Sequence, residues 1–294
     1  MTVEAIPYVV LLAFFFGTSL IASRFSVGRF EPLAFTGLRL TLAGLGSVAV
    51  YAMARRRRWP RDHRLWRHAI LLGIFGTAIP MTAVITALQH QSGGVTALLI
   101  TASPAVTVLL AHFFLPDESL SRLKVVGVLF ALGGAALLAL QGESGLADGS
   151  PASGIGYILV LVAMVASSVM TIYARKFMQD LDAFDVASVR MWSAALAVMP
   201  LSLLLFDMDM GRVDGWGFFA LIYSAVFGTF AGFLLAFYNI KRFGATAAAM
   251  TSYVIPIITG SGGVLLLGET VTPTMIVGMV IIVSGVAFIN RGSV

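Results

Sequence analysis

The sequence predicts an all-α membrane protein: ten transmembrane helices in two inverted five-helix repeats. Three observations predict this fold, namely an apolar composition, a regular succession of long apolar segments and a sparse internal repeat. Apolar residues make up 59% of the 294 residues and charged residues 11%, whereas soluble domains carry about 25% charged residues. A water-soluble core could not bury so much apolar surface, so we expect lipid to surround most of the chain.

Apolar segments of about 18–24 residues recur along the chain, the length that a helix needs to cross a bilayer. The expected spans are 5–23, 33–54, 68–88, 93–114, 123–141, 154–176, 184–206, 216–239, 244–267 and 273–290. Residues 1–141 would form a first five-helix repeat and residues 154–294 a second. The Gly-, Ser-, Ala- and Pro-rich segment 142–153 is interpreted as a linker loop.

Lys and Arg predict the orientation, because cytoplasmic loops of membrane proteins are enriched in both. If the N-terminus is cytoplasmic, 14 of the 19 basic residues lie in cytoplasmic loops and three in outer loops. The other two, Arg39 and Arg190, lie inside expected spans. We therefore expect both termini in the cytoplasm and the run Arg55–Arg58 to fix topology. The basic pI of about 9.8 is not taken as a sign of nucleic-acid binding, because the basic residues cluster between spans.

The two halves share a weak repeat. Residues 94–97 (Gly-Val-Thr-Ala) match residues 244–247 (Gly-Ala-Thr-Ala) at an offset of 150. Further pairs recur at an offset of 151: Arg24 with Arg175, Arg39 with Arg190, Glu118 with Glu269, Gly127 with Gly278 and Gly134 with Gly285. Because five is an odd number of spans, the second half must enter the membrane from the opposite face. Inverted repeats of this kind are typical of secondary transporters.

The motifs resemble those of the drug/metabolite transporter superfamily, in particular its EamA-type ten-helix transporters. The first span carries Phe16-Gly17-Thr18-Ser19 with Arg24 soon after, although the family's usual Trp is replaced by Phe16. Arg39 and Arg190 match the second-helix Arg of each repeat. Leu115-Pro116-Asp117-Glu118 and Leu267-Gly268-Glu269 match the acidic residue after the fourth helix. The resemblance covers the whole chain and implies a transporter, with amino-acid exporters of the YddG kind as the suggested subgroup.

Motifs for other chemistry are missing. The sequence has no Gly-Lys-Ser/Thr phosphate loop and no His-Glu-x-x-His, its four His residues form no cluster, and it has no Cys. We therefore expect no catalysis, no cofactor, no metal and no ATP-driven transport within this chain. All fourteen acidic residues fall in loops or at helix ends, which disfavours a carboxylate proton relay. A relay through His90 or His112 stays open.

Polar, aromatic and helix-interrupting residues near the middle of several spans are candidates for a central cavity. A mid-helix Pro frees a backbone carbonyl, which is tolerated in a membrane only against protein or a wet cavity. The candidate set is Phe16, Gly17, Thr18, Ser19, Thr77, Pro80, Ser103, Pro104, Ser167, Ser168, Phe227, Thr229, Tyr253 and Pro256. The alternative for any single Ser or Thr is contact between helices.

Arg39 and Arg190 lie about six residues inside their spans, roughly 9 Å at 1.5 Å per residue. They either extend to the nearer membrane surface or act as a gate or anchor that pairs with a loop acid or a substrate carboxylate. Spans five and ten are almost purely apolar and contain several Gly (Gly127, Gly133, Gly134, Gly278, Gly285), so we expect them to be packing helices outside the solute path.

Together these features predict a secondary transporter in the bacterial inner membrane that moves small organic solutes by alternating access. The resemblance implies that the solutes are amino acids or related metabolites and that they are exported. The lack of an acidic residue at mid-membrane favours facilitated diffusion. The expected partners are a small-molecule solute and membrane lipids, without nucleic acid, and the chain is expected to be a monomer. Two alternatives stay open: a proton-coupled multidrug or cationic-drug exporter, and a non-transport receptor or lipid-handling protein.

Overall fold

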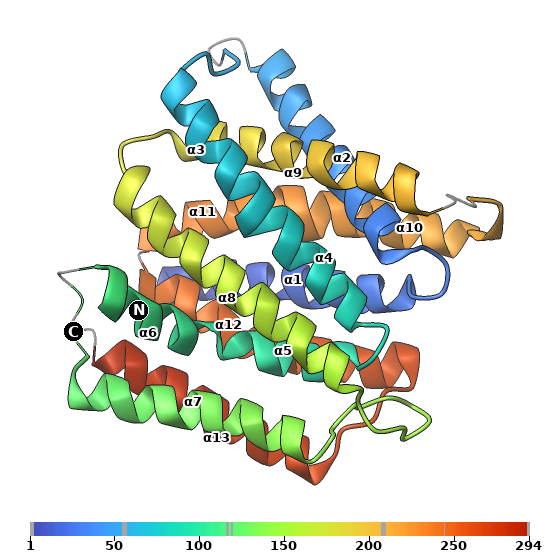
Figure 1. The fold of residues 1–294 in the computed structure, drawn as a ribbon, viewed down its shortest axis with the longest axis vertical. Helices are drawn as coiled ribbons and strands as arrows, with labels where there is room; N and C mark the ends of the chain where they lie inside the picture. Colours follow the sequence, from blue (N-terminus) through green and yellow to red (C-terminus); the bar gives the residue numbers. More distant parts are fainter. Residues whose placement is uncertain are drawn as a thin grey trace.

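The computed structural model describes residues 3–54, 58–115, 118, 120–206, 210–243 and 245–292. Within these residues the secondary structure is helical, apart from one isolated bridge between Val27 and Phe30. The helices form a single bundle (Figure 1). Arg55–Arg57, Pro116, Asp117 and Gly244, which entered the sequence argument, lie outside the described residues.

Ten spans in the described part of the chain are long and apolar enough to cross a bilayer, which confirms the predicted number. In chain order they are α1 (Ile6–Phe25), α2 (Pro32–Met53), α3 with α4 (His63–Gly73, Ile79–Ala87), α5 with α6 (Gly93–Thr101, Ser103–Phe114), α7 (Arg122–Leu140), α8 (Gly154–Phe177), α9 (Ala183–Leu205), α10 with α11 (Gly215–Tyr223, Gly232–Phe243), α12 (Ala245–Leu267) and α13 (Pro273–Arg291). The chain is therefore a multi-pass membrane protein.

The third span begins five residues before the predicted start at residue 68. The side chain of Asp62 accepts a hydrogen bond from the backbone N–H of Arg64 (2.8 Å) and so begins α3 at His63. The first turn is polar, so apolarity alone could not show it as part of the helix. Ser or Asp caps of the same kind begin α5, α7, α8, α9 and α10.

The bundle has two ends. α1 begins and α13 ends at one of them, here called the terminal end, on the left in Figure 1. The loop 141–153 lies at the other, here called the linker end. Because each half has five spans, every helix in the second half runs antiparallel to its counterpart in the first, as an inverted repeat requires.

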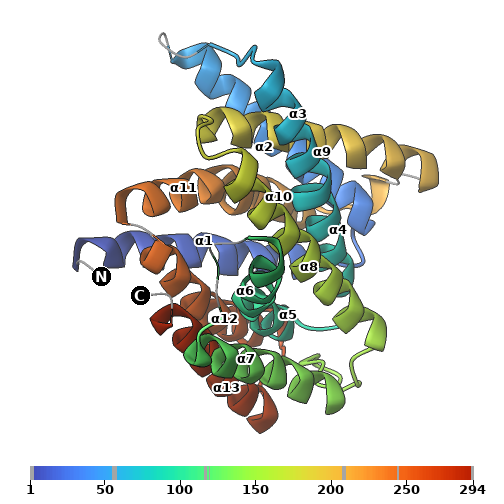
Figure 2. The ribbon, with the colours of Figure 1, turned by 60° about the vertical axis from the view of Figure 1, so that its left-hand side comes forward.

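Several helix pairs join the two halves, and in two of them repeat-related helices face each other: α7 packs on α13, and α2 packs on α9 (Figures 1 and 2). Glycines let α7 and α13 approach at backbone distance. A Cβ at Gly127 would lie 2.6 Å from the carbonyl oxygen of Gly285, and one at Gly278 would lie 2.8 Å from the side chain of Leu138. Gly133 differs from this expectation, because nothing lies within 4 Å of the position that a Cβ would occupy there.

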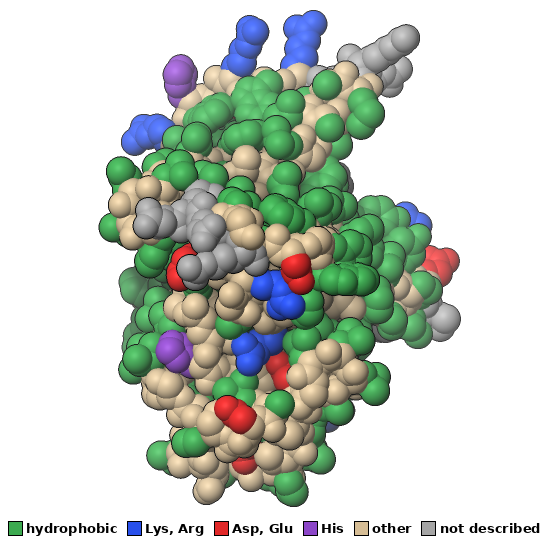
Figure 3. All heavy atoms as spheres, turned by 90° about the vertical axis from the view of Figure 1, so that its right-hand side faces the viewer, with side chains coloured by type: hydrophobic (Ala, Val, Ile, Leu, Met, Phe, Trp, Pro, Cys, Tyr) green, Lys and Arg blue, Asp and Glu red, His purple; other side chains and the backbone are tan. Residues whose placement is uncertain are grey.

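Large apolar side chains cover the outside of the bundle. Leu140 is 85% exposed, and Leu204 and Leu265 are each 81% exposed. In water such an apolar surface would cause the protein to aggregate, so we infer that the hydrocarbon core of a membrane surrounds it. Figure 3 looks onto the linker end, where several acidic and basic side chains lie near the middle of the face and other basic side chains project at the top.

Candidate functional site: a cavity between the two halves

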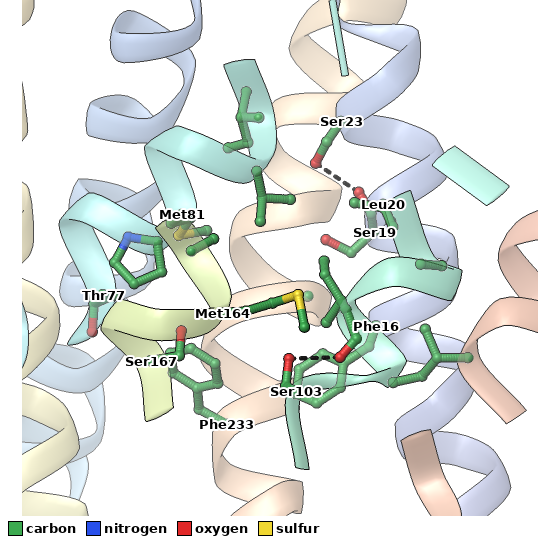
Figure 4. A pocket seen from close by; sticks show the side chains of 18 of the residues that line it. Phe16, Ser19, Leu20, Ser23, Thr77, Met81, Ser103, Met164, Ser167 and Phe233 are labelled. Carbon is green, nitrogen blue, oxygen red and sulfur yellow. Dashed lines mark hydrogen bonds between the residues drawn. The ribbon is translucent and has the colours of Figure 1, made fainter. Parts of the chain in front are cut away.

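A cavity of about 360 Å³ lies inside the bundle. Its lining comes from both halves, with residues of α1, α2, the third and fourth spans, α8, α9, α11 and α12. Serine and threonine hydroxyls, Met and Phe side chains and two arginines share its wall, and Figure 4 shows ten of these side chains by name. No Asp or Glu is among the lining residues.

Eight of the residues singled out from the sequence line this cavity: Phe16, Ser19, Thr77, Pro80, Ser103, Ser167, Arg39 and Arg190. They come from six different spans, so the fold brings together side chains that are far apart in the sequence. Ser103 follows the break between α5 and α6 at Ala102, and its hydroxyl donates to the carbonyl oxygen of Ile100 (2.6 Å).

The other candidates lie outside the lining. The Thr18 hydroxyl is 2.8 Å from that of Tyr223, and Ser168 accepts a hydrogen bond from Thr107 (2.8 Å). These two hydroxyls join helices, as the alternative interpretation of polar residues allowed. Gly17 packs against Ile258 of α12.

Phe227 and Tyr253 were expected at mid-cavity but do not line it. Phe227 is 40% exposed on the outside of the bundle, and its ring packs at a tilt against the rings of Phe15 and Tyr223. The Tyr253 hydroxyl accepts a hydrogen bond from Asn290 (2.7 Å) and so faces α13. The position of a residue along its span determines its depth in the membrane. It does not determine whether the side chain points into the cavity, toward another helix or toward lipid.

The prolines interrupt the helices to different degrees. Pro80 follows a π-helical segment, Ile74–Ala78, at the start of α4. Pro104 begins α6 after the break at Ala102. Pro256 lies within α12, which continues past it. Neither Pro104 nor Pro256 is among the lining residues.

A second π-helical segment, Ser224–Ala231, lies in the eighth span and was not predicted, because no Pro marks it. A sequence signal was available: Gly76-Thr77 recurs as Gly228-Thr229 at an offset of 152. Each dipeptide lies in a π-helical segment. π-helical turns inside α-helices are frequent at functional sites, and Gly76, Thr77 and Gly228 line the cavity.

Each arginine reaches the π-helical segment of the opposite half. Arg39 Nε donates to the Thr229 hydroxyl at 2.7 Å, and Arg190 Nε donates to the Thr77 hydroxyl. Neither arginine has an acidic partner among the described residues, so both put positive charge beside the cavity without a protein counter-ion. They also point inward rather than to the membrane surface.

A repeat-related ion pair lies at each end of the bundle. At the linker end, Arg24 Nε is 3.6 Å from Glu269 Oε1. Glu269 also accepts backbone hydrogen bonds from Gly93 (2.9 Å) and Gly94 (3.4 Å) at the start of α5. At the terminal end, Arg175 and Lys124 both pair with Glu118.

The two pairs differ in burial. The side chains of Arg24 and Glu269 are 23% and 5% exposed, whereas those of Arg175 and Glu118 are 46% and 23% exposed. Two backbone contacts of the linker loop support the linker-end pair: the Ser92 N–H donates to the Ser144 carbonyl, and the Thr270 N–H donates to the Gly145 carbonyl. The linker end is therefore the more tightly closed of the two in this structure.

Comparisons with known proteins agree with this architecture. Residues 4–140 and 154–291 each match the EamA-like transporter family. An "Uncharacterized transporter" of Archaeoglobus fulgidus is 23% identical over 94% of this chain and 95% of its own length. The "Uncharacterized inner membrane transporter YedA" of Escherichia coli K12 is 23% identical over 94% of this chain and 87% of its own length.

A further relative, the "Uncharacterized protein PA1977" of Pseudomonas aeruginosa, is 29% identical over 88% of this chain and 84% of its own length. A solved crystal structure shares the fold, with a TM-score of 0.66 at 23% identity over 98% of this chain and 96% of that one. Since the family match covers both halves, the chain belongs to the EamA-like transporter family, within the drug/metabolite transporter superfamily.

Proposed function

We propose that this transporter exports small organic solutes, amino acids or related metabolites, by alternating access and without ATP. The cavity between the two halves carries the proposal. Its volume of about 360 Å³ lies within the range of about 300–1,000 Å³ that is typical of small-molecule sites, and both halves line it. Inverted-repeat transporters place the substrate at such an interface.

The ends of the bundle support alternating access. A repeat-related ion pair closes each end, and only one of the two is well buried in this structure. Exchange of the closed and the open end would carry the cavity contents across the membrane. Three interruptions lie beside the cavity, at Ala102 and in the segments Ile74–Ala78 and Ser224–Ala231, and helices can bend at each of them.

A facilitator fits the cavity better than a proton-coupled exporter of cations. The lining has two arginines and no acidic residue, so it would repel a cationic drug and lacks the carboxylate relay that proton coupling commonly uses. His90 and His112 are not among the lining residues either. A receptor or lipid-handling protein would have no need of two related ends.

The proposal can be tested by measuring flux across the membrane of proteoliposomes that contain the purified full chain. Each of the twenty amino acids is supplied in turn on one side of that membrane. We expect downhill flux of some of them without ATP, retained when an ionophore collapses the pH gradient. Loss of flux on collapse would show proton coupling. If the liposomes contain folded protein but show no flux of any solute, the transport proposal is contradicted and a receptor is favoured.

Location and assembly are part of the proposal. We place the chain in a bacterial inner membrane as a monomer, with both termini in the cytoplasm, supported by the distribution of basic residues and by the glycine-rich faces of α7 and α13 packing on each other within one chain. A reporter active only in the periplasm, fused after Val294, should give no signal. A strong periplasmic signal would reverse the orientation.

A further inference from the structure

The two repeat-related arginines, Arg39 and Arg190, differ in how many of their guanidinium nitrogens donate a hydrogen bond to the protein. In Arg39 each of the three nitrogens donates a hydrogen bond to a hydroxyl: Nε to Thr229 (2.7 Å), Nη1 to Ser23 (2.9 Å) and Nη2 to Ser19 (2.9 Å). Arg39 is buried, with 8% of its surface exposed. Its guanidinium therefore joins α1, α2 and the π-helical segment Ser224–Ala231 as a structural clamp.

In Arg190 only two of the three guanidinium nitrogens donate hydrogen bonds to the described part of the protein. Nε donates to the Thr77 hydroxyl and Nη2 to the carbonyl oxygen of Gly76 (2.8 Å). Nη1 has no hydrogen-bond partner among the described residues. The guanidinium carbon lies 5.3 Å from the centre of the Phe233 ring, which also lines the cavity. Arg190, which is only partly buried and lines the cavity, thus has one nitrogen without a protein acceptor among the described residues.

The sequence explains the difference. At the offset of 151 that relates Arg39 to Arg190, Ser19 corresponds to Met170 and Ser23 to Ala174. The packing agrees: a Cβ at Gly228 would collide with Ser19, and one at the equivalent Gly76 would collide with Met170. The second half therefore lacks the two hydroxyls that satisfy Nη1 and Nη2 in the first.

A free guanidinium beside a cavity selects one ligand chemistry. Its planar N–H groups match a carboxylate, and a charge-assisted hydrogen bond of this kind is roughly twice as strong as a neutral one. A charged side chain inside the membrane is energetically costly and is found mainly at functional positions. A cation without an acidic partner in the protein therefore indicates an anionic ligand. No acidic residue of the lining competes for it.

We propose that Arg190, through its free Nη1, binds the carboxylate of the transported solute, and that Arg39 is the structural member of the pair. This inference rests on the proposed transport function and narrows it to solutes with a carboxylate group. The Phe233 ring lies beside the guanidinium, 5.3 Å from its carbon, and has no acceptor that would compete with a carboxylate for Nη1.

Ala174→Ser is the sharpest test. Ser23 donates its own hydrogen to the carbonyl oxygen of Ser19 (2.7 Å), four residues back, and accepts from Arg39 Nη1. A serine at 174 would donate to Met170 in the same way and offer its oxygen to Nη1 of Arg190. Ala174 packs in one cluster with Val186, one helical turn before Arg190. The change adds one oxygen and removes no charge.

Binding would be measured as thermal stabilisation of the purified full chain by a panel of the twenty amino acids, their deaminated acids and their carboxamides. We expect at least one carboxylate to bind and its carboxamide to bind at least tenfold more weakly. Ala174→Ser should lower the affinity for that carboxylate about tenfold without lowering the melting temperature. Val169→Thr, which adds a hydroxyl to the exposed face of the same helix, should leave the affinity unchanged.

Arg190→Gln and Arg190→Lys give a second readout that does not depend on the new serine. Arg190→Gln should remove the preference for carboxylate over carboxamide, and Arg190→Lys should keep part of it. The inference is overturned if no carboxylate binds, if carboxamides bind as well as carboxylates, or if Arg190→Gln keeps the preference. Flux of neutral solutes without carboxylate preference would overturn it while leaving the proposed transport function intact.

Discussion

The guanidinium of Arg24 lies 3.6 Å from the carboxylate of Glu269, and this contact ties the end of α1 to the loop between α12 and α13. Glu269 also accepts the backbone N–H groups of Gly93 and Gly94. One carboxylate therefore holds three separate segments at the linker end. Its repeat-related counterpart, Glu118, holds Arg175 and Lys124 at the terminal end, where the pair is more exposed.

Removing the charge of Glu269 should open the linker end. We expect Glu269→Gln to raise the access of a water-soluble reagent to the cavity from that end about tenfold, because the change removes the charge that pairs with Arg24 and weakens the acceptor of the Gly93 and Gly94 N–H groups. The chain has no Cys, so Leu20→Cys, at a lining position, gives a single reporter. Its rate of reaction with an impermeant maleimide would be measured in vesicles that expose the linker end.

Asp214→Asn is the matched control at the same end. It removes the charge from an exposed pair, in which Arg29 and Asp214 lie 3.2 Å apart, and exposed pairs contribute little. Asn also keeps the cap of α10, because Asp214 accepts from the Gly217 N–H and Asn caps helices as well as Asp does. Equal maleimide rates in Glu269→Gln and Asp214→Asn would contradict a closing role for Glu269.

Acidification should loosen the linker end before the terminal end. Burial raises the pKa of Glu269 by more than the Gly93 and Gly94 N–H groups and Arg24 lower it. The hydrogen bond from Arg175 lowers the pKa of Glu118, with Lys124 adding to the effect. As the pH falls towards the ordinary Glu pKa of about 4.3, Glu269 therefore gains a proton at a higher pH than Glu118 does.

The signs of the two stability contributions differ. A raised pKa means that folding favours protonated Glu269, so its protonation weakens the ion pair without unfolding the protein. The lowered pKa of Glu118 contributes stability that is lost only as the pH falls through its folded value. Maleimide access at Leu20→Cys should therefore rise as the pH falls towards about 4.3, without a fall in melting temperature and after correction for thiol ionisation. Glu269→Gln should abolish that rise.

The ten spans could be predicted because length and apolarity determine a transmembrane helix almost by themselves. The start of α3 could not, since three of the five residues His63–Arg67 are His or Arg, and the helix begins there at the Asp62 cap. The inverted arrangement followed from an odd number of spans and from pairs such as Arg39 and Arg190 at one offset.

The cavity could be predicted only in part. Depth along a span was readable, and it placed Ser103 and Ser167 on the wall. The side of the helix on which a residue lies could not be predicted, because lipid and a neighbouring apolar helix favour the same apolar residues. The sequence therefore could not show that Phe227 and Tyr253 lie outside the lining of this cavity. The π-helical segments shift the register of the third and eighth spans, and that shift decides which side chains meet the arginines.

The interface of α7 and α13 should tolerate no side chain at its closest point. A Cβ at Gly285 would lie 2.4 Å from the backbone nitrogen of Ala131 and 2.6 Å from the carbonyl oxygen of Gly127. Gly285→Leu must separate two backbones, at a cost of at least about 1–3 kcal/mol, and we expect low yield and a lower melting temperature. Gly133→Leu on α7, where nothing lies within 4 Å, should have little effect, and equal damage in both variants would contradict the packing role.

Ser103→Trp should block transport without unfolding the protein. Ser103 lies on the cavity wall (Figure 4), directly after the break at Ala102, so an indole there would fill the space that the solute needs. We expect the flux in proteoliposomes to fall at least about tenfold, equivalent to about 1.4 kcal/mol, while the protein still inserts and elutes as a single species.

Val162→Trp adds the same ring on the exposed face of α8, where lipid can accommodate it, and should transport normally. Normal flux through Ser103→Trp would mean that the solute does not pass this wall, although the fold, which rests on the ten spans and the family match, would be unaffected.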